Sequence, residues 1–340
     1  MIKEIWVAGF PSFVGGADTE LLHNIDLWIS NNVSVNLVPM FGMNDTVSEY
    51  VKSIGCNIHV YNSNIFKDKI LVSFCNGEFL SKLPEIMELG KPKTIIWFNC
   101  MTWTFDKELE AHKNGWIDYF GFVSNFQKKF LLPQLEKIRP VKVFEGYIPY
   151  FNPNNFCQKI KFEYKKPINY FGVGRLSRDD PAKFSSDMWK IFDKVCCPIP
   201  KKVFILGFND KVREKTGDPP DGLDWMYWVA GAIPVNELYN TIHCIIHKTG
   251  GSRESYCRIV PEAYAFGVPI IVEDDYAFPE LVIDGETGFR CKSSDEMSYR
   301  ASELCFNENK RKKIILNANK HLYENIANKD KCWIPWNNIL

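Results

Sequence analysis

The sequence of 340 residues lacks several patterns that would assign it to a structural class at once. Its 41 basic and 41 acidic side chains leave no net charge, so no overall field attracts the chain to nucleic acid or to an anionic membrane. No hydrophobic run approaches the roughly 20 residues that a membrane-spanning helix needs. The segment MIKEIWVAGF is too short, before Pro11 interrupts it, for a secretory signal. We therefore expect a cytoplasmic protein without a membrane span.

Motifs of three common site types are also missing. The 11 cysteines form no CxxC pair and no zinc spacing, which favours reduced thiols that pack as small hydrophobic side chains. The 6 histidines include no HExxH motif, so the sequence does not predict a zinc hydrolase. His243 and His247 bracket one apolar run and are interpreted as structural. No GxGxxG motif follows a predicted strand, which argues against a nicotinamide-dependent oxidoreductase.

What the sequence does contain, 46% hydrophobic and 24% charged residues, is the composition of a globular chain with a large core. In the first half, short apolar runs alternate with stretches of helical spacing. The runs predict strands at 5–10, 33–41, 57–61, 70–74, 94–98, 119–124 and 141–146, and the spacing predicts helices at 17–29, 78–89 and 125–138. Continuous apolar strands separated by helices indicate a parallel sheet that is covered on both faces.

The alternation stops after Gly146, where a segment rich in Pro, Asn and Lys predicts a linker near residues 150–166. It then resumes with strands at 168–174, 203–208, 224–230, 243–247 and 268–273, and with helices at 183–195, from Val235, near Glu262 and over 295–325. We predict an α/β chain of two Rossmann-like, doubly wound domains, residues 1–150 and 167–325, whose sheets face a cleft. Because Trp333 and Trp336 would be costly to expose, the tail 326–340 is expected to pack back on the first domain.

Gly15 and Gly16 stand between the first predicted strand and its helix. Paired glycines allow backbone N–H groups to approach an anion at a helix N-terminus, where the peptide dipoles favour negative charge. The alternative interpretation is an ordinary turn between a strand and a helix.

A second candidate segment is FGVGRLSRDDPAKF, residues 171–184. Arg175, Arg178 and Lys183 follow a strand end, where a guanidinium could bind two oxygens of a diphosphate and an ammonium could add a point charge. The alternative is a solvated loop in which Asp179 and Asp180 pair with these bases.

The third segment, residues 248–289, places Glu254 on a loop and Glu262 at a helix start, both near the carboxyl end of the second sheet. Carboxylates there can accept hydrogen bonds from the vicinal hydroxyls of a sugar or a ribose. Two unrelated glutamates near a helix N-terminus would be an ordinary dipole effect.

Together these segments resemble the retaining nucleotide-sugar glycosyltransferases of family 4. Glu254 and Glu262 match the E-x7-E region of that family, which continues here through Ala263, Gly267 and Pro269 to FPELV and DGETGF. VGGAD near the start, GRLS at 174–177 and EGYIPYFNP at 145–153 also match in the expected order. The resemblance therefore covers most of the chain.

The resemblance implies a GT-B fold and a nucleoside diphosphate sugar, expected to be a UDP-sugar, bound mainly by the second domain without a metal or other cofactor. Arg175 and Lys183 would hold the diphosphate, Glu262 the ribose hydroxyls and Glu254 the transferred sugar, so that Glu254, Arg175 and Lys183 are the catalytic candidates. Gly15 and Gly16 would bring the first-domain loop over the diphosphate. The sugar or distal phosphate would meet backbone amides at Ser255, Tyr256, Cys257 and Arg258.

Two departures from the family pattern concern single residues. In many relatives the lysine follows the arginine by five residues, but Asp180 stands there and Lys183 comes three later. A histidine that is common at the end of a middle strand of the first domain is missing from TIIWFNCMTW, where Asn99 or Cys100 stands instead. Either Asn99 is the polar group on the acceptor side, or that role has moved to another residue.

The sequence thus predicts a retaining, metal-independent glycosyltransferase that moves a hexose or pentose to an acceptor hydroxyl, with a glycan or surface polysaccharide as the expected acceptor. One alternative is transfer to hydroxymethylated bases of viral DNA, for which a basic strip could serve, made of Lys128, Lys129, Lys137, Arg139 and Lys142. Another is a sugar-nucleotide binding protein without turnover. Retention of Arg175, Lys183, Glu254 and Glu262 together argues against that second alternative.

Overall fold

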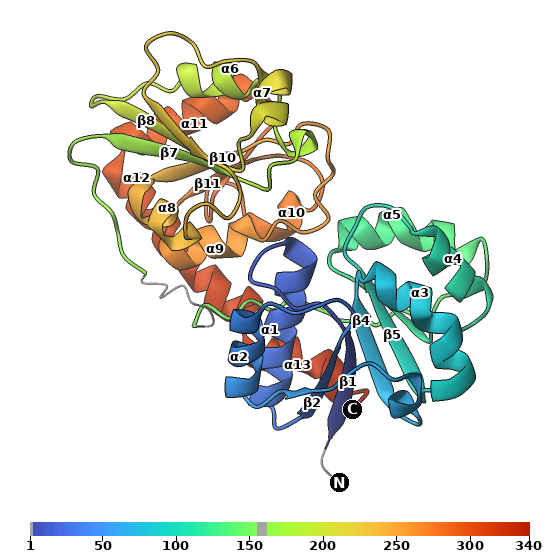
Figure 1. Ribbon diagram of the computed structural model, residues 1–340. Helices are drawn as coiled ribbons and strands as arrows, with labels where there is room; N and C mark the ends of the chain where they lie inside the picture. Colours follow the sequence, from blue (N-terminus) through green and yellow to red (C-terminus); the bar gives the residue numbers. More distant parts are fainter. Residues whose placement is uncertain (1–2, 155–161) are drawn as a thin grey trace. The chain divides into compact units, whose positions relative to one another are not determined.

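The computed structural model describes residues 3–154 and 162–340 (Figure 1). The chain divides into two compact units, unit 1 comprising Met1–Asn155 with Ile326–Leu340 and unit 2 comprising Phe156–Asn325. Each unit holds a six-stranded sheet with flanking helices, so the predicted α/β fold with two doubly wound parallel sheets is confirmed. Residues 155–161 of the expected linker, among them Cys157, lie outside the described residues.

Unit 1 contains a parallel sheet of strand order β3-β2-β1-β4-β5-β6. Its strands are β1 (Glu4–Gly9), β2 (Ser34–Pro39), β3 (Asn57–Ile58), β4 (Ile70–Phe74), β5 (Thr94–Asn99) and β6 (Tyr119–Phe122). The strand predicted at 141–146 is wrong, because this segment pairs with β6 only through an isolated bridge between Phe120 and Val143. The chain then turns away at Gly146, whose φ is 76°.

The helices of unit 1 follow the strands in alternation. They are α1 (Gly16–Ser30), α2 (Asp45–Ser53), α3 (Gly77–Glu85), α4 (Asp106–Lys113), α5 (Asn125–Glu136) and α13 (Lys329–Asn337), with short helical segments η1 (Ser63–Phe66) and η2 (Ile86–Gly90). The sequence did not predict α2, α4 or α13, which are short. Local capping supports two of them, since Asn44 accepts from the backbone of Thr46 and Asn328 from that of Lys331.

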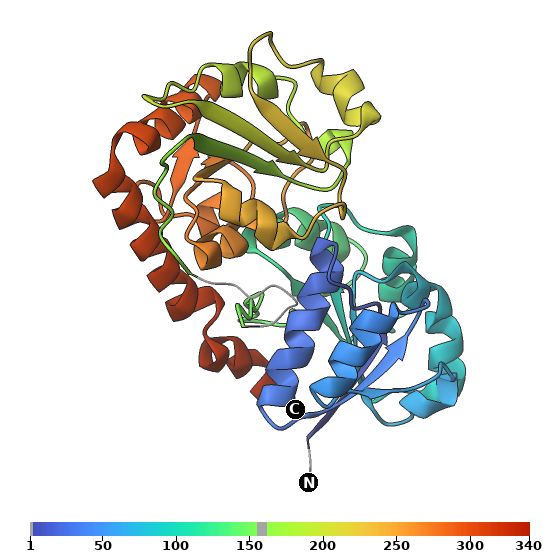
Figure 2. The ribbon, with the colours of Figure 1, turned by 60° about the vertical axis from the view of Figure 1, so that its left-hand side comes forward.

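Helix α13, at the C-terminal end of the chain, is part of unit 1 and lies beside α1 in both views (Figures 1 and 2). Trp336 is fully buried, with its ring 4.8 Å from that of Trp28 and 4.7 Å from that of Phe144. Asn337 accepts a hydrogen bond from Lys3 at 2.6 Å. The last residues of the chain therefore help to build the core of the unit that the first residues begin.

Unit 2 repeats the architecture with strand order β12-β11-β10-β7-β8-β9. Its strands are β7 (Phe171–Leu176), β8 (Lys201–Leu206), β9 (Trp225–Trp228), β10 (Cys244–His247), β11 (Ile270–Glu273) and β12 (Phe289–Cys291). Its helices are η3 (Pro181–Lys183), α6 (Met188–Asp193), α7 (Asp210–Thr216), α8 (Val235–Thr241), α9 (Ile259–Phe266), α10 (Phe278–Leu281), α11 (Ser294–Phe306), α12 (Glu308–His321) and η4 (Leu322–Ile326). Strand β12 was not predicted from the sequence.

The helix predicted at 183–195 is wrong at its start, because the segment is divided. Asp180 accepts from the backbone of Ala182 and caps the single turn η3, after which Phe184 is extended. Helix α6 begins only at Met188. As a result Lys183 lies on a turn that follows β7 rather than on a helix.

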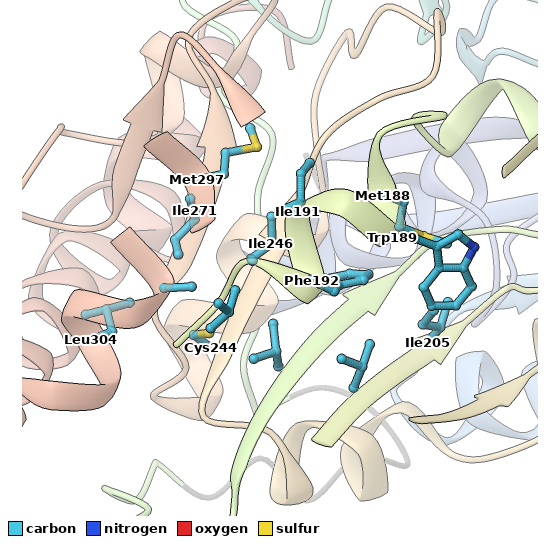
Figure 3. Close-up of a cluster of buried hydrophobic side chains, with 14 of the residues drawn as sticks. Met188, Trp189, Ile191, Phe192, Ile205, Cys244, Ile246, Ile271, Met297 and Leu304 are labelled. Carbon is cyan, nitrogen blue, oxygen red and sulfur yellow. The ribbon is translucent and has the colours of Figure 1, made fainter. Parts of the chain in front are cut away.

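The core of unit 2 fills the space between the sheet and helices α6 and α11 (Figure 3). Side chains from both layers meet there and are almost completely buried: Ile191, Phe192, Ile205, Cys244, Ile246, Ile271, Met297 and Leu304. Burying one such side chain contributes about 1.5–3 kcal/mol. The packed sheet gives the loops at its carboxyl end a rigid base. Over residues 3–154 and 162–340, no helix combines the length and the apolar character needed to cross a membrane.

Candidate functional site

The candidate site of unit 2 lies at the carboxyl ends of two neighbouring parallel strands. Strands β7 and β10 pair through Gly174 and Ile245. Arg175 comes directly after Gly174 and His247 two residues after Ile245, so both lie toward the same edge of the sheet. Ligands of open α/β sheets bind outside this edge. The turn with Lys183 and the loop with Glu254 extend from the same edge.

Arg175 is buried and its guanidinium donates to groups of the protein. Nη1 donates to the carbonyl of Leu176 and to Nδ1 of His247, the latter at 2.8 Å, and Nη2 donates to the carbonyl of Lys183. Burial lowers the pKa of Arg175 to about 10, which leaves it charged at neutral pH. The guanidinium therefore holds the backbone of Lys183 and supplies a positive charge from beneath the loops.

Lys183 and Glu254 form the central contact of the site. Lys183 Nζ donates to Glu254 Oε1 at 2.9 Å, and the two side chains are only 15% and 10% exposed. The residues are 71 positions apart in the sequence and meet because β7 and β10 are neighbours. An ion pair with this much burial is held firmly, since solvent screens it little.

His247 contacts the same carboxylate from the other side, with Nε2 3.5 Å from Glu254 Oε1. Burial alone would raise the pKa of Glu254, but the neighbouring His247 and Lys183 outweigh it and hold that pKa at about 2. Burial and the charge of Arg175 lower the pKa of His247 to about 4. At neutral pH the site therefore presents an ionised Glu254 and a neutral imidazole.

Glu262 lies in the first turn of α9 and is partly buried. Its Oε2 accepts a hydrogen bond of 3.0 Å from the hydroxyl of Tyr239, which α8 supplies. Burial raises the pKa of Glu262, although Arg258 and Tyr239 act in the opposite direction. The carboxyl group is anchored through one oxygen.

The residues between the two glutamates form the approach to α9. Ser255 and Tyr256 are partly exposed, and Cys257 and Arg258 are buried. The backbone carbonyl of Glu254 accepts from Ala277 at 3.2 Å, which ties this loop to the segment before α10. The loop is thus fixed at both the side chain and the backbone of Glu254.

In unit 1, Gly15 and Gly16 stand at the N-terminus of α1. Gly15 is the N-cap residue, and its φ of 97° belongs to the left-handed region that favours glycine. Its carbonyl accepts from the hydroxyl of Thr19 at 2.8 Å. The site predicted here is therefore a helix start with a backbone geometry that a residue with a side chain would adopt only under strain.

Asn99, the candidate on the acceptor side, is buried at the end of β5. Its amide nitrogen donates to the carbonyl of Trp103 and to Glu108, each at 2.9 Å, and its oxygen accepts from the backbone of Met101 at 2.7 Å. These bonds use both amide protons of Asn99. In this conformation the side chain holds the loop that follows β5.

Sequence reasoning did not identify His247 or Tyr239. The interpretation of His243 as structural agrees with its contact, in which Nδ1 accepts from the backbone of Gly172 at 2.9 Å. His247 was interpreted in the same way, but it lies between Arg175 and Glu254. Its position could have indicated a role in the site, because His247 is the last residue of an apolar run. The last residue of a parallel strand lies at the carboxyl edge of the sheet, where ligands bind.

The comparisons with known proteins give a matching family model and several similar folds. Residues 226–321 match the family model described as "Glycosyl transferases group 1", a stretch that includes His247, Glu254 and Glu262. The search of curated proteins found no match. The match covers part of unit 2 and confirms the expected enzyme class, a glycosyltransferase.

Solved structures of three proteins are similar to the whole chain. HepE from Anabaena in complex with UDP and glucose has a TM-score of 0.70 at 15% identity, covering 99% of both chains. A mutant of TarM from S. aureus, in complex with Fondaparinux, alpha-GlcNAc-glycerol and UDP, has a TM-score of 0.73 at 11% identity, covering 99% of both. The lipopolysaccharide outer core galactosyltransferase WaaB has 0.64 at 13%, covering 99% of this chain and 100% of that one. At these identities the matches show the fold, which is GT-B as predicted.

Proposed function

We propose that this protein is a retaining, metal-independent glycosyltransferase of family 4. It transfers a hexose or pentose from a nucleoside diphosphate sugar, with UDP as the nucleotide, to a hydroxyl group of a glycan or surface polysaccharide. The glycosyl transferases group 1 match and the UDP in the HepE and TarM complexes support this choice of reaction and nucleotide. We place the reaction in the cytoplasm.

The observation that carries the proposal is the buried contact between Lys183 and Glu254 above the charge of Arg175. An ammonium group can stabilise the negative charge that develops on a leaving diphosphate, and an ionised carboxylate can accept from sugar hydroxyls. The site combines both within 2.9 Å. Donor binding would exchange part of the contact between Lys183 and Glu254 for contacts with phosphate and sugar.

In the proposed mechanism the bond between the anomeric carbon and the diphosphate oxygen breaks while Lys183 and the charge of Arg175 stabilise the leaving oxygens. The acceptor oxygen attacks on the same face, and a leaving phosphate oxygen takes its proton. Glu254 orients the sugar by accepting from its hydroxyls, while His247 keeps the carboxylate in place. Glu262 binds the ribose hydroxyls through the oxygen that does not face Tyr239.

A glycan acceptor is preferred to DNA because two members of the basic strip of unit 1 are engaged by neighbouring side chains. Lys128 donates to both carboxylate oxygens of Glu145, at 2.8 and 2.9 Å. Lys142 lies over the ring of Tyr119, with Nζ 4.1 Å from its centroid. No described feature of unit 1 adds a specific argument for a nucleic-acid acceptor.

A thermal-shift scan with UDP, GDP and a panel of UDP- and GDP-sugars, with and without EDTA, tests the proposal. A ligand at 100 times its Kd should add about 2.7 kcal/mol to the free energy of unfolding. We expect UDP and one UDP-sugar to stabilise the protein, and EDTA to leave this stabilisation unchanged. A turnover assay with the same UDP-sugar should then show release of UDP and retention at the anomeric carbon. Lys194→Ala is the matched control for Lys183→Ala, since Lys194 pairs with Asp295 at 2.7 Å on the exposed surface. Equal stabilisation of both variants by UDP-sugar would contradict the assigned site.

A further inference from the structure

We propose that His247 is a positioning residue of the donor site, which fixes Arg175 and Glu254 relative to each other as a neutral imidazole with its proton on Nε2. This inference rests on the proposed function, because it assigns His247 a part in placing the groups that would hold the donor. The contacts of the imidazole ring with its neighbours support this role. The imidazole is 1% exposed at the end of β10.

The tautomer follows from the partners of the two ring nitrogens. Nδ1 lies 2.8 Å from Nη1 of Arg175. A guanidinium is always a donor, so Nδ1 must be the acceptor and cannot carry the proton. In the neutral ring the proton is then on Nε2, which faces Oε1 of Glu254 at 3.5 Å and Sγ of Cys257 at 4.0 Å.

The groups around the ring keep it neutral and in one orientation. Arg175 on β7 faces Nδ1, while Glu254 and Cys257 on the loop before α9 face Nε2. Lys183 on η3 reaches the same oxygen of Glu254. Phe278 of α10 packs against the ring, with centroids 5.5 Å apart at an angle of 64°.

The arrangement brings the His247 ring into contact with both Arg175 and Glu254. If the proton moved to Nδ1, or if the ring gained a second proton, an N–H would face the guanidinium of Arg175, and the contact would become repulsive. If the ring turned over, a C–H would take the place of Nδ1, and the hydrogen bond from Arg175 would be lost. With the proton on Nδ1 alone, Nε2 could no longer donate to the carboxylate of Glu254, which would then depend on Lys183. Because donor binding requires Lys183 to turn toward phosphate, His247 is the partner that keeps Glu254 in place during that exchange.

The experiment compares His247→Gln, His247→Phe and the matched control His243→Gln from the other end of the same run. A glutamine can accept with its oxygen and donate with its nitrogen, whereas phenylalanine keeps the ring without either bond. We expect His247→Phe to weaken UDP-sugar binding and to lower kcat by roughly 10- to 100-fold each. UDP alone should be affected less, because it lacks the sugar that Glu254 would orient. His247→Gln should recover most of the loss, and His243→Gln should stay within about 3-fold of the wild type.

Nitrogen-15 NMR of histidine-labelled wild-type protein, with His247→Gln to assign the signal, measures the tautomer without any substrate. The expected result at pH 7 is a neutral ring protonated on Nε2. A proton on Nδ1, or wild-type affinity for UDP-sugar in His247→Phe, would overturn the inference. A wild type that binds no nucleotide sugar while the tautomer is as expected would instead refute the proposed function, and with it the role of His247 in the donor site.

Discussion

Two substitutions at the contact between Lys183 and Glu254 should separate the effect of Lys183 on stability from its effect on activity. Removing one partner of a buried ion pair costs about 3–5 kcal/mol, because the other charge stays buried. The side chains are 15% and 10% exposed, and His247 continues to donate to Glu254 after Lys183 is removed. We therefore expect the lower end of that range for Lys183→Ala. For a unit of this size, about 3 kcal/mol corresponds to a fall in Tm of roughly 6–12 °C.

Activity should respond to the same change for a different reason. If Lys183 stabilises the leaving diphosphate, its loss removes a charged contact of about 1.5–4 kcal/mol, and kcat/KM falls roughly 10- to 1000-fold. The double variant Lys183→Ala with Glu254→Gln carries no stranded carboxylate, so most of the lost stability should return. Its activity should not return, since no ammonium group faces the phosphate.

The assay measures urea unfolding and steady-state kcat/KM on the wild type, the single variants and the double variant. Lys194→Ala is the control, because its exposed pair with Asp295 contributes at most about 1 kcal/mol. Wild-type kcat/KM in Lys183→Ala would refute the reasoning, as would a double variant that regains activity together with stability.

Three further outcomes are expected. Glu262→Ala should lower kcat/KM roughly 10- to 1000-fold and weaken UDP as much as UDP-sugar, since the ribose is common to both; an effect on UDP-sugar alone in calorimetry would contradict this role. The pKa of His247 is lowered to about 4 in the folded protein, so unfolded chains bind more protons between pH 4 and about 6.5, and stability rises with pH across that window. Between pH 5 and pH 7, the rise in the free energy of unfolding measured with urea should be about 2 kcal/mol smaller in His247→Gln than in the wild type. An equal rise in both proteins would exclude a buried neutral ring. Trp336→Ala should destabilise the protein by about 3–5 kcal/mol through the cavity beside Trp28, and a Tm equal to that of the wild type would contradict the packing of α13.

The sequence predicted most strands because parallel strands that are covered on both faces are continuous apolar runs. It failed where local pattern and tertiary pairing disagree. The run at 141–146 is apolar enough for a strand but makes one bridge with β6, whereas the three residues of β12 are too few to give a pattern. The predicted helix at 183–195 was divided by the cap that Asp180 provides.

For the site, the sequence predicted residue types and their strand ends but not their partners. Glu254 and Glu262 could be selected from their spacing, yet nothing local shows that Glu254 meets Lys183 across 71 positions. Arg175 could be selected as a cation, but its inward hydrogen bonds depend on where His247 and the turn at Lys183 lie. The predicted division into residues 1–150 and 167–325, the cleft between the sheets and the loop role of Gly15 and Gly16 stay predictions.

The position of α13 in unit 1 has a consequence for how the chain is made. Unit 2 is, in effect, inserted into unit 1, which comprises Met1–Asn155 and Ile326–Leu340. On the ribosome, the six strands of the first sheet are complete long before the residues that cover Trp28 and Phe144 emerge. The apolar surface of unit 1 that α13 covers therefore stays exposed while unit 2 is translated and can fold. Termination just before residue 326 would leave unit 2 whole and unit 1 without its last layer.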